Sequence, residues 1–539
     1  MAEGNQSDPS PPPGAAPSTR GHLAVAFGIL LSRIAGFARE RAIAHYLGNT
    51  DASGAFRAAL RIPNLLQNLF GEGVLSASFI PVYARLVSQD RHDDARRVAS
   101  AVASLLLGAT AVLVLLGVSF APELTTLLAP GFSGPTRMLT IRITRVLFPG
   151  AGILVLSAWC LGVLNSHRRL FLSYAAPVVW NVAMIATLVV FAGPLVGAPL
   201  AGGSLAVRLA WGAVVGSALQ LAIQLPSALR LARGFRPSLG RRDPEVSRVL
   251  SSFGPVVVAR GVVQISAYVD QLLASFLGAA TVSAIGFAQT IALLPVSLFG
   301  MSVSAAELPE MSRLTGSGGD VAKELHARLG PAMRRIGFLV APSTVAMLLL
   351  GRDLVGALFQ TGTFGAQDTR AVAWILVGAS VGLLAVTRAR LYSSALYALG
   401  ETRAPLRFAL GRVALSAALG VVATFPAQSA LGYGPTTAAS LIVASSGVAG
   451  WLELLLLRAA LSSRIGPPPS TWRGDARIWA VALVAGGAAA AIAWALPVDR
   501  PLLHALATLP AFGGTYLVLA HLAGVPDARA LAARVTRRR

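Results

Sequence analysis

Charged residues and cysteine are both scarce in this chain of 539 residues. Only 13% of the residues are charged, and Cys160 is the single cysteine. No disulfide can form within the chain, and a zinc site built from cysteine pairs is excluded. Lys323 is the only lysine, so the chain has no phosphate-loop lysine and no ATP motor of that kind. The seven histidines show no metal-ligand spacing, and we expect no metal, no cofactor and no catalytic centre.

Hydrophobic residues, in contrast, make up 55% of the sequence, and the mean hydropathy is +0.66. Apolar stretches recur that are long enough to cross a hydrocarbon core of about 30 Å. The predicted fold class is therefore an all-α polytopic membrane protein. The net charge of +22 does not indicate binding to nucleic acid, because the basic residues are spread between apolar segments and do not cluster with aromatic residues.

Breaks between the apolar runs predict fourteen transmembrane helices, whose ends are placed to within about two to four residues. Many of them exceed the roughly twenty residues that a span requires, so tilted helices or ends that project into water are expected. The predicted spans are 22–47, 52–87, 97–128, 136–165, 170–194, 204–233, 246–278, 281–312, 324–360, 367–399, 403–425, 436–463, 474–496 and 501–524.

The loops between these spans alternate in charge. One set is rich in arginine, whereas Arg500 is the only basic residue in the other set. By the positive-inside rule, the arginine-rich loops and both termini are cytoplasmic, which requires an even number of spans. Residues 1–20 are rich in proline, serine and glycine, and we expect them to form a disordered tail and not a signal peptide.

An internal repeat divides the predicted helices into two sets of six. The segment LFGEGVLSASFIPVYARL (69–86) aligns with LFGMSVSAAELPEMSRL (298–314) after one gap. Both halves start on the cytoplasmic side, so the repeat is parallel, with a pseudo-twofold axis along the membrane normal. Chance similarity between apolar segments is the alternative explanation. The predicted parts are an N-lobe (21–235), a C-lobe (244–465), two C-terminal helices (472–524) and a basic cytoplasmic tail (525–539).

Four arginines lie inside the first two apolar stretches. They are Arg33 and Arg39 in the first stretch, and Arg57 and Arg61 in the second. A charged side chain near the centre of a bilayer costs about 2.5 to 3.5 kcal/mol on insertion scales, so such residues face an interior or a water-filled cavity and not lipid. The sequence therefore predicts a cavity that receives an anionic molecule.

The segments that carry these arginines resemble a known family. SRIAGFARERAIAHYLG (32–48) and AFRAALRIPNLLQNLFGEGVLSASFIPVYA (55–84) are similar to the opening of the MurJ/MviN lipid II flippases of the MOP exporter superfamily. The resemblance implies that the chain moves lipid II, an undecaprenyl-diphosphate that carries a disaccharide-peptide, across the bacterial inner membrane. It also implies two lobes around a cationic cavity, alternating access, and a groove for the lipid tail on the last two helices.

The resemblance further assigns roles to particular residues. Arg33 and Arg39 match cationic positions of the family, and Glu40 and Glu72 match acidic ones, for which we expect a role in gating or ion pairing. The structural alternative is that Arg33 and Glu40, which are seven residues apart and nearly aligned on a helix, form a structural ion pair with a neighbour. The family has an acidic residue directly before the Ala-Phe pair of the second helix, whereas this chain has Gly54 at that position.

Two expected basic positions are occupied by other residues here, namely Gln67 and the neighbourhood of Thr290. We hypothesise that Arg57, Arg61 and Arg260 supply the missing charge and bind substrate. Arg57 and Arg61 are four residues apart and so share one face of a helix. The alternative for Arg57 is that it reaches toward the outer membrane interface.

Two further acidic residues are predicted to act in gating or ion pairing. Asp270, ten residues after Arg260, pairs across the lobes or binds a coupling cation, and Glu307 lies near the cytoplasmic end of its helix. Because no ATP site is present, we expect the energy to come from the membrane potential or a monovalent cation. Expected partners are lipid II, membrane lipids and the cell-wall synthesis machinery, but not nucleic acid, and the protein is expected to be a monomer.

Three other functions remain open from the sequence. The chain could move a different lipid-linked oligosaccharide, since several family charges have shifted. It could be a drug or ion antiporter of the MOP superfamily, although a cationic drug favours acidic cavity residues. A membrane scaffold without transport activity is the third alternative, and it predicts that the arginines can be neutralised without effect.

Overall fold

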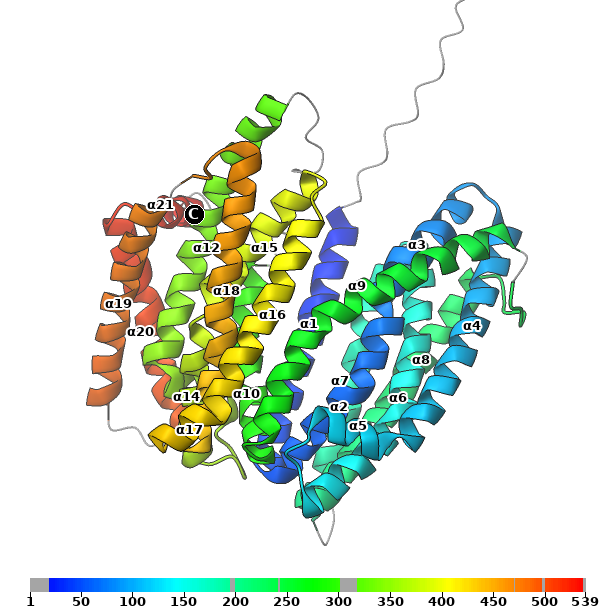
Figure 1. Cartoon of the computed structure of the whole chain (residues 1–539), viewed down its shortest axis with the longest axis horizontal. Coiled ribbons are helices and arrows are strands. Elements are labelled where there is room, and N and C mark those ends of the chain that lie inside the picture. Colours follow the sequence, from blue (N-terminus) through cyan, green and yellow to red (C-terminus); the bar gives the residue numbers. More distant parts are fainter. Residues whose placement is uncertain are drawn as a thin grey trace, which may run out of the picture.

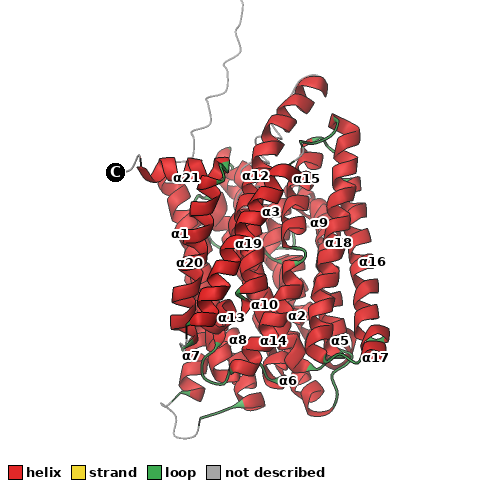
Figure 2. Cartoon of the chain, turned by 90° about the vertical axis from the view of Figure 1, so that its left-hand side faces the viewer, coloured by secondary structure: helices red, strands yellow, loops and turns green. Residues whose placement is uncertain are grey.

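The computed structural model describes residues 19–193, 199–240, 243–300, 318–469, 471–496 and 500–536. This part of the chain is helical and contains no strand, as Figure 2 shows. The helices are α1 (Thr19–Leu47), α2 (Asp51–Phe70), α3 (Glu72–Ser88), α4 (His92–Ser119), α5 (Ala121–Leu128), α6 (Gly134–Ser166), α7 (Leu170–Ala192), α8 (Gly202–Leu231), α9 (Pro244–Ser275), α10 (Ala279–Pro295), the π-helix η1 (Val296–Gly300), α12 (Gly318–Leu349), α13 (Gly351–Phe359), α14 (Ala366–Ser380), α15 (Leu383–Ala398), α16 (Arg403–Thr424), α17 (Pro426–Leu431), α18 (Pro435–Ile465), α19 (Trp472–Ala495), α20 (Pro501–Leu522) and α21 (Pro526–Thr536).

The prediction of an all-helical polytopic membrane protein is confirmed. Eleven helices within the described residues are long and apolar enough to span a membrane. The other three predicted spans correspond to α1, to α2 with α3, and to α9, so the count of fourteen stays a prediction. The expected disordered tail lies almost wholly outside the described residues.

The helices form two bundles that lie side by side in Figure 1. In the first bundle α6 packs against α8 and α2, and α7 packs against α1 and α8. In the second bundle α18 packs against α14, α15 and α16. Helices α19 and α20 pack on each other and reach the second bundle through α12 and α13. The domain boundaries and the lipid-tail groove stay predictions.

Several predicted spans are divided into two helices. The second span, predicted as 52–87, breaks at Gly71, where a Cβ atom would lie 2.2 Å from the carbonyl oxygen of Gln67. The tenth span breaks near Gly382, where a Cβ would lie 2.4 Å from the Cα of Gly447 on α18. At Gly382 glycine lets α18 approach closely, whereas at Gly71 the crowding atom is the carbonyl of the preceding turn, which accepts the Gly71 amide.

Helix α9 connects the two bundles. It begins beside α3 and α4, where Glu245 accepts a hydrogen bond from Arg85 Nη2 at 2.5 Å and lies 3.5 Å from Arg91. Its later part packs against α10 and α16, and Tyr268 and Asp270 lie in this part. A single tilted helix thus touches both bundles, as Figure 1 also shows.

The bundles meet at the end that carries the loops poor in arginine. The hydroxyl of Ser283 on α10 donates to the hydroxyl of Ser53 on α2 at 2.9 Å. Beside them, a Cβ on Gly54 would lie 1.9 Å from the carbonyl oxygen of Ala279. The family's acidic residue is therefore replaced by Gly54 for a physical reason: any side chain at this position would push α2 and α10 apart.

A second set of contacts closes the same end between α1 and the segment around α13. The amide of Thr363 donates to the carbonyl of His45 at 2.9 Å. Arg41 Nη1 donates to the carbonyls of Ala357 and Leu358 at 2.7 and 2.8 Å. These bonds use backbone groups at a helix end, which would otherwise lack partners.

Candidate functional site

Glu40 is the centre of a buried charge cluster between α1 and α2. Its side chain accepts a hydrogen bond from Arg39 Nη2 at 2.7 Å and one from Arg57 Nη2 at 2.6 Å. The residue is only 7% exposed, so its charge has little contact with solvent. Two guanidinium groups therefore share one carboxylate, and the cluster carries an excess of one positive charge.

Aromatic and amide groups from other helices hold the two arginines. The guanidinium of Arg39 lies 5.0 Å from the ring centre of Trp180, and its Nη1 donates to Asn181 Oδ1 at 3.0 Å. The guanidinium of Arg57 lies 4.1 Å from the ring centre of Phe287 on α10. Planar arginine side chains stack on aromatic faces in this way, which also excludes water from them.

Two N–H groups of the cluster donate no hydrogen bond within the described residues. The Nε–H groups of Arg39 and Arg57 are buried and have no hydrogen-bond partner among the described residues. A buried donor without an acceptor is costly, so such a group in a native fold calls for an explanation. An anion that reaches the cluster would neutralise the excess charge and offer oxygen acceptors.

Arg61 lies one turn further along α2 and also faces α10. Its Nη2 donates to Gln289 Oε1 at 2.9 Å, and its own carbonyl accepts from the hydroxyl of Tyr268 at 3.1 Å. Arg57 and Arg61 thus approach the part of α10 where the family's basic residue was expected, near Gln289 and Thr290. Their role as replacements for that charge stays a hypothesis.

Arg33 differs from the other three arginines because it is exposed. Its Nη1 donates to the hydroxyl of Ser297 on η1 at 3.0 Å. It lies six residues before Arg39, which is about 9 Å along a helix. The structure therefore brings Arg39 and Arg57 together at Glu40 and places Arg33 and Arg61 apart from that cluster.

Asp270 accepts hydrogen bonds from a serine, and no arginine within the described residues forms a direct ion pair with it. The hydroxyl of Ser446 lies 3.2 Å from each of its carboxylate oxygens and 2.7 Å from the hydroxyl of Ser416. Arg61 and Arg412 are the nearby cations that act on Asp270 electrostatically. Within the described residues, no group of three His, Cys, Asp or Glu side chains could hold a metal ion.

The alternatives for Glu40 and Arg57 can now be compared with the geometry. Glu40 forms an ion pair with Arg39 and Arg57, as the structural alternative held, whereas Arg33 donates to Ser297 and forms no ion pair within the described residues. The side chain of Arg57 is 14% exposed and points to Glu40, so it does not reach toward the membrane interface. Three predicted side chains lie outside the described residues, those of Glu72, Arg260 and Glu307.

Other ion pairs between helices were not predicted from the sequence, and two of them involve arginines inside apolar runs. Arg388 of α15 donates through Nη1 and Nη2 to Asp475 of α19 at 2.8 and 2.7 Å. Arg412 of α16 lies 2.9 Å from Glu453 of α18. Arginine inside an apolar run is the signal that could have found both pairs, because it also marked the first four arginines.

Comparisons with known proteins identify relatives along most of the chain. The model of the family "Lipid II flippase MurJ" matches residues 43–500. The chain is 31% identical over 476 residues to the lipid II flippase MurJ of Burkholderia cenocepacia, which covers 87% of this chain and 89% of that protein. It is also 31% identical over 446 residues to a probable lipid II flippase MurJ of Rhizobium tropici, covering 82% of this chain and 80% of that one.

Solved structures show the same fold at lower identity. A lipid II flippase MurJ in an inward closed conformation matches with a TM-score of 0.74 and 22% identity, over 94% of this chain and 98% of that one. An inward-facing MATE-family multidrug transporter of the MOP superfamily matches with a TM-score of 0.63 and 17% identity, over 82% of this chain and 98% of that one.

We expect Glu40→Gln to destabilise the protein strongly. The substitution leaves Arg39 and Arg57 buried without a counter-charge, and breaking a buried pair in this way costs about 3 to 5 kcal/mol. Thermal unfolding of the purified protein in detergent measures the effect. Glu324→Gln is the matched control, because Glu324 pairs with Arg328 at the surface, where such pairs contribute about 0 to 1 kcal/mol. Equal shifts in the two variants would contradict a structural role for the buried cluster.

Proposed function

This chain belongs to the lipid II flippase MurJ family, and on that basis we propose that it moves lipid II from the inner to the outer leaflet of the bacterial cytoplasmic membrane. The headgroup of that lipid carries a diphosphate and peptide carboxylates, which are anions. The protein contributes binding sites and conformational change, and no chemical step is required of it. It is therefore a membrane transporter and not an enzyme.

The excess of positive charge at Glu40 is the observation that supports this proposal most. Arg39 and Arg57 share a single carboxylate, and their Nε–H groups lack acceptors among the described residues. Arginine binds phosphate oxygens through its planar fork and stays charged in apolar surroundings. A cationic drug would be repelled by the same groups, which argues against the antiporter alternative despite the shared MATE fold.

We propose that the described conformation is closed toward the outer side. This assignment follows the positive-inside rule, which puts the arginine-rich loops in the cytoplasm. The contacts between Ser53 and Ser283 and between His45 and Thr363 then lie at the outer end. Release of the headgroup to the outer leaflet requires the two bundles to separate there, as in alternating access.

The membrane potential is the energy source that we propose. Outward movement of an anion across a membrane that is negative inside is favourable, by about 2.3 kcal/mol per elementary charge for each 100 mV. The cationic groups that hold the headgroup stay with the protein, so the transferred charge is that of the lipid. A coupling cation at Asp270 is not needed in this scheme.

Growth of a bacterium depleted of its own lipid II flippase tests the proposed function. We expect the wild-type chain to restore growth. Arg33→Ala should reduce rescue by about tenfold or more, because one charge-assisted bond to a phosphate is worth roughly 1.5 to 3 kcal/mol, while Arg33→Lys retains part of the activity. Arg33 suits this test because it is exposed and lies outside the buried cluster, so its loss leaves the fold intact.

Arg403→Ala is the control for the rescue experiment. Arg403 is also exposed, but it is the first residue of α16 and lies outside the predicted substrate site. It should rescue as well as the wild type. Failure of the wild-type chain to rescue, despite good insertion into the membrane, would contradict lipid II as the substrate while leaving the fold unaffected.

A disulfide between positions 53 and 283 should block transport. The Oγ atoms of Ser53 and Ser283 are 2.9 Å apart, so cysteines at both positions can reach each other across the two bundles. The single native cysteine, Cys160, is buried and can be replaced by alanine to leave a clean background. Flipping of a fluorescent lipid II in vesicles should stop on oxidation and return on reduction.

Ser53→Cys alone is the control for the disulfide experiment, and it should remain active under oxidising conditions. Full transport by the double variant with its disulfide completely formed would mean that the outer end does not need to open.

A further inference from the structure

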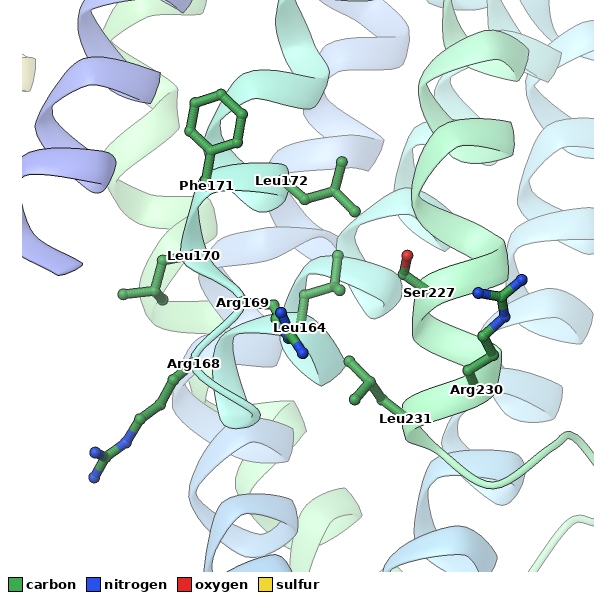
Figure 3. A pocket seen from close by; sticks show the side chains of 9 residues that line it. All are labelled: Leu164, Arg168, Arg169, Leu170, Phe171, Leu172, Ser227, Arg230 and Leu231. Atoms are coloured by element: carbon green, nitrogen blue, oxygen red, sulfur yellow. The ribbon is translucent and has the colours of Figure 1, made fainter. Parts of the chain in front are cut away.

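A separate cavity lies at the arginine-rich end of the first bundle, away from the Glu40 cluster (Figure 3). Its volume is about 550 Å³, and it is formed by the end of α6, the start of α7 and the end of α8. Figure 3 shows Arg169 beside Leu164 among the lining residues, while the side chains of Arg168 and Arg230 extend outward on opposite sides. The lining thus combines three arginines with apolar side chains.

The three arginines are available to a ligand. Arg168, Arg169 and Arg230 are exposed, and no carboxylate lines the cavity. None of the three forms an ion pair or a side-chain hydrogen bond within the part of the chain that the structure describes. Arg168 also has a φ angle of 58°, a left-handed conformation that is uncommon for a residue other than glycine. The turn between α6 and α7 therefore displays two successive arginines at the cavity.

The wall that α8 contributes continues into the lipid-facing surface of the bundle. Leu219, Ile223, Ser227 and Arg230 follow one another at intervals of three or four residues, so they share one face of the helix. Leu219 and Ile223 are exposed apolar side chains on the membrane-spanning part of α8. The cavity thus lies at the end of a stripe that contacts lipid hydrocarbon.

The wall from α7 has the same character. Phe171 lines the cavity and is 48% exposed, and Val182 and Val189 lie on the same face of α7 at whole numbers of helical turns. Both valines are exposed as well. This face of α7 points away from α8, because Trp180, Ala183 and Thr187 are the α7 residues that contact α8, so the stripe of Leu219 and Ile223 on α8 is the apolar surface that adjoins the cavity.

We propose that this cavity binds an anionic glycerophospholipid of the adjacent leaflet, the cytoplasmic one in the proposed orientation. The arginines bind the headgroup phosphate, and the acyl chains lie along the exposed apolar stripe of α8. Basic pockets between transmembrane helices on the cytoplasmic side recognise lipid headgroups through this combination of charge and apolar surface. A free phosphate would use the arginines but not the apolar walls.

The size and position of the cavity favour a glycerophospholipid over the transported lipid. A phosphoglycerol headgroup fits inside the cavity whole, whereas a disaccharide-peptide headgroup would have to remain outside it. None of the residues that line the cavity belongs to the Glu40 cluster, and Leu219 and Ile223, which precede Ser227 on the same face of α8, are exposed. Phe171 stacks on Phe27 of α1 with ring centres 6.5 Å apart. A lipid bound in the cavity would therefore touch Phe171, which packs on α1, the helix that carries Arg33 and Arg39.

Native mass spectrometry of the full-length protein released from nanodiscs tests this proposal. The nanodiscs contain equal amounts of phosphatidylglycerol and phosphatidylcholine. The triple variant Arg168→Gln, Arg169→Gln and Arg230→Gln should retain about tenfold less phosphatidylglycerol than the wild type, because its charge-assisted hydrogen bonds to the phosphate are lost. Ser227→Trp, which fills the cavity without changing charge, should cause a comparable loss.

A matched triple, Arg233→Gln, Arg236→Gln and Arg407→Gln, removes the same charge from exposed positions outside the cavity. It should retain phosphatidylglycerol like the wild type. Equal retention by the two triples, or unchanged retention in Ser227→Trp, would overturn the proposal. So would displacement of the lipid by millimolar inorganic phosphate, since the site would then recognise the anion alone. The readout is lipid retention and not transport, so it is independent of whether lipid II is the substrate.

Discussion

The shared ion pair of Glu40 with Arg39 and Arg57 is the interaction on which the rest of the arrangement depends. It joins α1 to α2 in an apolar interior, where isolated charges would be prohibitive. One carboxylate stabilises two guanidinium groups, so the interior keeps an unbalanced positive charge. That imbalance costs stability in the empty protein and supplies attraction for an anionic headgroup.

The same arginines also take part in the contact between the bundles. Arg57 stacks on Phe287 and Arg61 donates to Gln289, and both partners lie on α10 of the second bundle. An anion that competes for these guanidinium groups would weaken the attachment of α10 to α2. Close to them, α2 and α10 touch through Ser53 and Ser283. Headgroup binding and opening of this end can therefore be coupled through one pair of helices, without a separate relay.

Much of this architecture follows from the sequence, and the exceptions have identifiable causes. Apolar runs gave the helices, but the break at Gly71 depends on backbone packing that a hydropathy pattern does not contain. Arginines in apolar runs predicted a buried cationic site. The sequence could not predict that Arg57 pairs with Glu40, because the two residues lie on different helices and 17 positions apart. The pair of Arg388 and Asp475 spans 87 positions, and only the packing of α19 on the second bundle brings the two together. Gly54 stands where the family has an acidic residue, and the structure shows that the close contact with Ala279 requires glycine at this position.

The central claim is that the excess positive charge of the interior selects an anionic lipid. The most direct measurement compares the rates at which the purified wild-type protein flips fluorescent lipid II and an analogue with an uncharged linker in place of the diphosphate, in the same proteoliposomes. The diphosphate lipid should move rapidly, and the uncharged analogue should move no faster than in protein-free vesicles. Equal rates for the two lipids would contradict it.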